Sequence, residues 1–164
     1  MAEVLQTRRD LLDPIRLTVL VTSAEEMATM GALYHVRRNL AELQREAFNR
    51  QVHILNFDGT GIDGGLYVSG GGRGRGALAW MITAAGKELN IPVGHFRLPG
   101  VLFDHVPFKE HGFDAASLIA IGKASWAVHT ARDTPDKLRP RGFEMAGRVA
   151  LKVIEKVVQA QRRG

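Results

Sequence analysis

The sequence contains no cysteine among its 164 residues, which excludes a disulfide framework and any thiolate metal site. A metal bound here must therefore be held by His, Asp and Glu. The sequence also has no apolar run near the roughly 18 residues that a membrane-spanning helix needs. The charged, amphipathic residues 1–13 lack the apolar core of a secretory signal. We therefore expect a soluble chain without a membrane segment.

Low-complexity tracts, solenoid-type repeats and long linkers are absent as well. The hydrophobic share is 45% and the charged share is 24%, both ordinary for a globular protein. A chain of this length can bury roughly 70% of the surface that it exposes when unfolded, which is enough for a hydrophobic core. We expect one domain over residues 1–164.

The net charge of +5 and the pI of 10.0 raise the question of an anionic partner. The basic residues come in small scattered groups: Arg8-Arg9, Arg37-Arg38, Arg73 with Arg75, Arg139 with Arg141, and Arg162-Arg163. Aromatic residues do not alternate with them, as they do in proteins that bind single-stranded nucleic acid. We therefore expect solvated basic surfaces and no nucleic-acid partner.

Strand-like and helix-like patterns alternate along the chain. A short amphipathic helix is predicted over residues 1–12, a buried β-branched strand over 17–22, and a helix from about Ala28 to Phe48. Extended segments at 52–57, 66–69, 93–98 and 116–121 follow, with helices at about 77–89 and 140–161. This order predicts an α/β fold, a three-layer α/β/α sandwich with a mostly parallel or mixed sheet.

Polar side chains follow three of the predicted strands. Glu25-Glu26 comes after the first, Asp58 after the second, and His129 lies in the loop after the last. Ligands of open α/β sheets bind beyond the carboxyl ends of the strands, so we expect these residues to meet at one edge of the sheet.

These side chains suit metal-assisted hydrolysis, in which one carboxylate holds the cation and an unligated one takes a proton from water. Each also has a structural interpretation. Adjacent glutamates alone are weak evidence, Asp58 is equally well a turn residue in Asn-Phe-Asp-Gly-Thr-Gly, and a lone His129 is more often a surface residue. Asp104-His105 similarly reads either as a helix start with Asp104 as the cap, or as groups that orient a ligand or contact substrate.

Four segments resemble the co-catalytic two-zinc aminopeptidases, a family that includes bacterial leucyl aminopeptidase and aminopeptidase Y and has glutaminyl cyclase as a relative. They are Val-Leu-Val-Thr-Ser-Ala-Glu-Glu at 19–26 followed by Gly31-Ala32, Asn-Phe-Asp-Gly at 56–59, Phe-Asp-His-Val-Pro-Phe at 103–108, and His-Thr-Ala-Arg-Asp-Thr-Pro-Asp at 129–136. The resemblance implies that Glu25 is the general base and that Glu26, Asp58 and His129 are zinc ligands. It implies removal of N-terminal residues from peptide substrates, with a zinc-dependent exopeptidase-like fold.

The sequence departs from that family pattern in one respect. Members carry a His-x-Asp segment and an Asp-Asn segment before the acidic pair, and neither is present here. We therefore expect a partial zinc peptidase catalytic domain with an incomplete two-metal site, completed by an N-terminal half or by a homo-oligomer. Two alternatives stay open: an inactive binding or assembly module on the same scaffold, and a glutaminyl cyclase-like acyltransferase.

Overall fold

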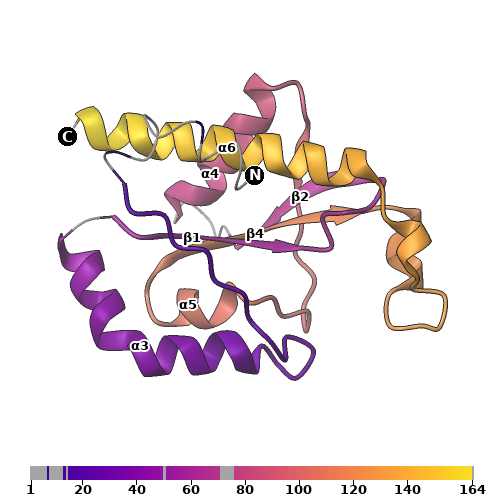
Figure 1. The fold of residues 1–164 in the computed structure, drawn as a ribbon, viewed down its shortest axis with the longest axis horizontal. Coiled ribbons are helices and arrows are strands. Elements are labelled where there is room, and N and C mark those ends of the chain that lie inside the picture. Colours follow the sequence, from indigo (N-terminus) through magenta and orange to yellow (C-terminus); the bar gives the residue numbers. More distant parts are fainter. Residues whose placement is uncertain (1–6, 8–12, 14, 50, 71–75, 164) are drawn as a thin grey trace.

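The computed structural model describes residues 7, 13, 15–49, 51–70 and 76–163 (Figure 1). The helix predicted at 1–12 lies largely outside these described residues. Among the helices of the described part, none is long and apolar enough to cross a membrane.

Four strands form an open mixed sheet in the order β1-β4-β2-β3. They are β1 (His53–Asp58), β2 (Gly65–Ser69), β3 (Val93–His95) and β4 (Asp114–Ile121). β1 and β4 are parallel, β2 is antiparallel to β4, and β3 is parallel to β2. The ends of β1 and β4 therefore lie at the same edge of the sheet as the starts of β2 and β3. We call this edge, where Asp58 is in register with Ile119, the carboxyl edge.

Helices cover both faces of the sheet, as the predicted sandwich requires (Figure 1). α4 (Ala77–Glu88) and α6 (Pro140–Arg163) lie on one face, and α3 (Met30–Asn49) and α5 (Val106–Glu110) lie on the other. The predicted fold class is therefore confirmed.

The larger core lies between the sheet and the α4–α6 layer. In α4 the buried residues recur at helical spacing, with Leu78, Ile82 and Ala85 on the inward face. Ile82 and Leu118 of β4 are fully buried, and each such side chain stabilises the fold by about 1.5–3 kcal/mol. A smaller core packs α3 and α5 against the other face, with Phe108 buried at its centre.

The predicted strand at 17–22 does not form. These residues have no strand assignment, and Val19 and Val21 are 82% and 89% exposed. The helix that follows begins at Met30 rather than near Ala28, because Ala28 and Thr29 have positive φ angles of 57° each. Elsewhere the predicted elements are confirmed to within a few residues, although β3 ends at His95 rather than at residue 98.

Candidate functional site

Glu25 and Glu26 lie in a tight turn that leads into α3. The backbone N–H of Thr29 donates to the carbonyl of Glu25 at 2.8 Å, and the N–H of Met27 donates to that of Ala24 at 3.2 Å. Gly31 at the start of α3 lies so close to Ser23 that an added Cβ would be 2.0 Å from the Ser23 carbonyl oxygen. The glutamate turn is therefore packed directly on the first turn of α3.

His129 meets this turn from the other side. It follows the 3₁₀ helix η1 (Lys123–Ala127), and its Nδ1 lies 3.5 Å from Oε2 of Glu26. Both side chains are largely exposed. The loop after β4 therefore comes into contact with the turn before α3.

Asp58 and Asp104 add two more carboxylates to the same region. Burial raises the pKa of Asp58, and the negative charges of Asp104 and Glu26 raise it further. Partial burial raises the pKa of Glu25, as do Asp58, Glu26 and Asp104, whereas His129 opposes the rise. The structure thus brings all four carboxylates and His129 within electrostatic reach of one another.

Asp104 is held from the segment before the glutamate turn. Its Oδ2 accepts a hydrogen bond from the hydroxyl of Thr22. The residue is only 7% exposed, and its Oδ1 is buried without a hydrogen-bond partner among the described residues. The prediction that Asp104 caps the following helix is wrong, because α5 begins at Val106 with His105 at the cap position and no side-chain capping bond.

His105 points into a buried polar network. Its Nδ1 lies 2.6 Å from the hydroxyl of Ser117, which also accepts a hydrogen bond from Asn56 Nδ2 at 2.9 Å. The Ser117 hydroxyl therefore links the imidazole of His105 to the amide of Asn56 on the neighbouring strand. Burial, assisted by the nearby Lys109, lowers the pKa of His105 to about 4, so the imidazole is neutral at physiological pH.

Sequence reasoning missed Ser117, Asn56 and Thr22 as supporting residues. A detectable signal existed for Ser117, because it is the one hydroxyl within the apolar strand Ala-Ala-Ser-Leu-Ile-Ala-Ile. A buried hydroxyl needs a hydrogen-bond partner, so it marks a polar group on the neighbouring layer.

The loops after Asp58 and His129 are joined to each other. Ile62 and Leu138 form an isolated β-bridge, and the N–H of Arg139 donates to the carbonyl of Gly61 at 2.8 Å. Gly61 also lies beneath the ring of Phe143, which leaves no room for a side chain there. The two loops therefore form one connected wall of the site.

The side chains suit a cation by type and by charge. His, Asp and Glu supply the nitrogen and oxygen ligands of zinc sites without cysteine, and the unpartnered Oδ1 of Asp104 is buried beside crowded like charges. Within residues 15–49, 51–70 and 76–163, however, no three such groups are close enough together to hold a metal ion. The described residues thus provide suitable donors without a closed coordination set.

The chain belongs to peptidase family M28, whose sequence profile matches residues 1–154. Among curated proteins, no sequence matches the chain. The fold resembles that of solved structures at low identity. A zinc aminopeptidase from Bacillus subtilis matches with a TM-score of 0.66 and 20% identity, over 83% of this chain and 34% of that protein.

Two further structures match to a similar degree. The LapA aminopeptidase of Legionella pneumophila gives a TM-score of 0.67 with 19% identity, over 84% of this chain and 38% of that protein. A glutaminyl cyclase from an Acidobacteriales bacterium gives 0.61 with 22% identity, over 83% of this chain and 47% of that protein. The chain therefore spans about a third to a half of the length of the structures that it matches.

Proposed function

We propose that this chain carries the glutamate-bearing part of a zinc aminopeptidase-type active site, which removes N-terminal residues from peptides. The observation that carries the proposal is the convergence of Glu25, Glu26, Asp58, Asp104 and His129 at the carboxyl edge. Membership of peptidase family M28 supports it, as do the fold neighbours named as zinc aminopeptidases.

Each side chain has a role in this proposal. Glu26, Asp58 and His129 would hold zinc, which when bound makes water more acidic and polarises the peptide carbonyl. Glu25, adjacent to Glu26 in the turn, accepts the proton of the attacking water and passes it to the leaving amine. Asp104 orients the site through Thr22 and its free oxygen, and neutral His105 fixes the strand beneath through Ser117.

The two-metal site of the related aminopeptidases needs more ligands than these. We propose that a further polypeptide segment supplies them, either a complementing N-terminal half or a second copy of this chain. The exposed apolar residues at 17–21 support this, because they have no strand partner among the described residues and could pair with a strand from another segment. A segment paired there would lie directly before the glutamate turn.

Zinc titration tests the ligand roles. We expect the chain to bind zinc in competition with a chromogenic chelator, and Glu26→Gln or His129→Ala to weaken binding about 10-fold or more. His95→Ala is the matched control, because His95 is an exposed histidine at the end of β3. Equal weakening by His95→Ala, or none by the two site variants, would contradict the assignment.

Hydrolysis tests the reaction. Zinc-loaded chain, alone and with added N-terminal segment, should release amine from an aminoacyl anilide, and Glu25→Gln should abolish turnover while zinc binding remains. Ammonia release from a peptide with N-terminal glutamine would instead identify the cyclase reaction. Tight zinc binding with neither reaction would favour the binding module.

A further inference from the structure

A hollow of about 510 Å³ lies in the segment that follows β4, next to the loop that carries His129. Its polar and aromatic lining consists of Lys123, Trp126, Arg132, Thr134, Asp136 and Lys137. We call it the 123–137 hollow. Its wall comes from η1, from the loop that contains His129, and from the 3₁₀ helix η2 (Pro135–Lys137).

Positive charge exceeds negative charge in this hollow. Its one carboxylate, Asp136, accepts a hydrogen bond from the hydroxyl of Thr134 and pairs with Lys137 at 3.0 Å. Lys123 and Arg132 have no ion pair with the described residues. Two cations therefore face the hollow without a protein anion to neutralise them.

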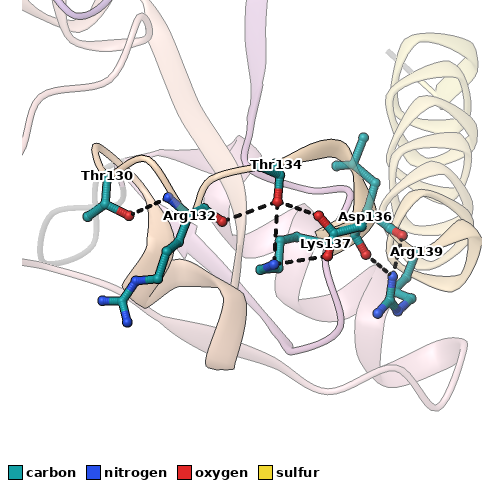
Figure 2. Close-up of polar contacts among 7 residues, drawn as sticks. Thr130, Arg132, Thr134, Asp136, Lys137 and Arg139 are labelled. Carbon is teal, nitrogen blue, oxygen red and sulfur yellow. Dashed lines mark hydrogen bonds and ion pairs between the residues drawn. The ribbon is translucent and has the colours of Figure 1, made fainter.

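The backbone of Arg132 is fixed, and its side chain is left available. Its N–H donates to the hydroxyl of Thr130 at 3.2 Å, and its carbonyl lies 3.3 Å from the hydroxyl oxygen of Thr134, whose one proton is directed to Asp136. Figure 2 shows the guanidinium extending away from the contacts among Thr134, Asp136 and Lys137. A guanidinium without a protein partner offers paired N–H donors that match the two oxygens of a carboxylate.

Trp126 places a flat apolar surface beside these cations. The residue is 85% exposed, so its indole is accessible to a ligand in the hollow. It lies three residues before His129, and Arg132 lies three residues after it. Three residues span at most about 11 Å, so the backbone of each residue lies within about three peptide units of the backbone of His129, a length that a dipeptide or tripeptide can bridge.

We propose that the 123–137 hollow binds the C-terminal carboxylate of a short peptide substrate. Arg132 and Lys123 hold the carboxylate, and Trp126 packs against the adjoining peptide unit. This inference rests on the proposed function and narrows its substrate class to dipeptides and tripeptides with a free C-terminus. A longer peptide would place an uncharged part of its main chain beside the two unpaired cations, so it would leave them without a negative partner.

Binding is measured without zinc and without turnover. The 164-residue chain with Trp80→Phe, in the presence of a chelator, leaves Trp126 as its single fluorescent indole. Acetyl-Ala-Ala should change the Trp126 emission saturably, whereas its C-terminal amide should not. Arg132→Gln should weaken binding about 10-fold, as expected for a charge-assisted hydrogen bond, and Lys123→Gln should weaken it less.

Arg37→Gln is the matched control, because Arg37 is an exposed arginine on α3 and should leave binding unchanged. Circular dichroism of each variant shows that it is folded. Equal binding of the amide, or unchanged binding by the Arg132 variant, would overturn the proposal. Equal binding of acetyl-Glu-amide would assign the site to acidic side chains instead, and equal binding of inorganic phosphate would make it a general anion site; both overturn it.

Two experiments keep this inference separate from the proposed function. If the chain hydrolyses peptides but does not bind the carboxylate selectively, the inference is wrong and the aminopeptidase assignment stands. If the chain binds the carboxylate but neither hydrolyses peptides nor binds zinc, the aminopeptidase assignment is wrong. In an active preparation, Arg132→Gln should raise KM for Leu-Ala while leaving KM for Leu-Ala-amide unchanged.

Discussion

The imidazole of His129 lies 3.5 Å from the carboxylate of Glu26, and this contact joins the loop after β4 to the turn before α3. The two side chains are exposed, so the attraction between them is weak on its own. Their positions are set instead by the packing of Gly31 on Ser23 and by the bridge between Ile62 and Leu138.

Thr22→Val should release Asp104 from the segment before the glutamate turn. The change removes the hydroxyl donor while keeping the side-chain shape, and it leaves both oxygens of a buried carboxylate without a partner. We expect the free energy of unfolding to fall by about 1–3 kcal/mol in urea titration. Thr18→Val, at an exposed position of the same segment, should change it little, and equal effects would contradict the role of Thr22.

Two glycines should respond in opposite directions to alanine. Gly31→Ala places a Cβ against the backbone oxygen of Ser23 and should destabilise the chain by about 1–3 kcal/mol. Gly147→Ala, in the middle of α6, meets nothing within 4 Å and should stabilise it by about 0.5–1 kcal/mol. Thermal unfolding measures the change in melting temperature of each variant. Equal destabilisation by the two variants would show that the close packing of Gly31 on Ser23 does not explain the effect of Gly31→Ala.

Acid should destabilise the chain through His105. The imidazole has a pKa of about 4 when folded and near 6.5 when unfolded, so the unfolded chain binds more protons between these values. Its contribution is complete above pH about 6.5 and is lost as the pH falls toward 4, by up to about 3 kcal/mol. Urea titrations across this range should show a shallower pH dependence for His105→Gln than for the parent, and identical slopes would contradict the prediction.

The exposed segment at 17–21 should make the chain self-associate. Val19 and Val21 present exposed β-branched side chains with no strand partner among the described residues. Sedimentation should show association that rises with concentration and is reduced by Val19→Lys with Val21→Lys. Phe48→Lys removes an equally exposed apolar side chain from α3 and should have little effect; if it abolishes association, general hydrophobicity is responsible.

Local patterns predicted most of the fold. β1 and β4 are short apolar runs between turn residues, and α4 and α6 repeat their apolar residues at helical spacing, so each pattern follows from burial on one side. The segment at 17–22 is also a short, largely apolar run, yet it forms no strand. A strand also needs a neighbour to accept its hydrogen bonds, and composition does not supply that neighbour.

The sequence predicted the residues of the candidate site better than it predicted the residues that hold them in place. Asp58 and His129 follow the parallel strands β1 and β4, so topology directs them to one edge, whereas Glu25 and Glu26 follow a predicted strand that does not form. The supports depend on contacts distant in sequence, as between Thr22 and Asp104 or between His105 and Ser117. No role for Arg132 could be read from its place in the segment 129–136, because only the folded loop shows that its side chain lines the 123–137 hollow without an ion pair among the described residues.

The left-handed backbone around the site bears on how the sequence can change over time. Ala24, Ala28, Thr29 and His129 all have φ angles between 55° and 63°, and each such non-glycine residue costs roughly 1–2 kcal/mol. Selection for heat resistance alone would replace Ala24, Ala28 or Thr29 with glycine or asparagine. Relatives that retain these residues would have a lower melting temperature and a less flexible turn. Their retention would indicate that the geometry of the two glutamates matters more than stability.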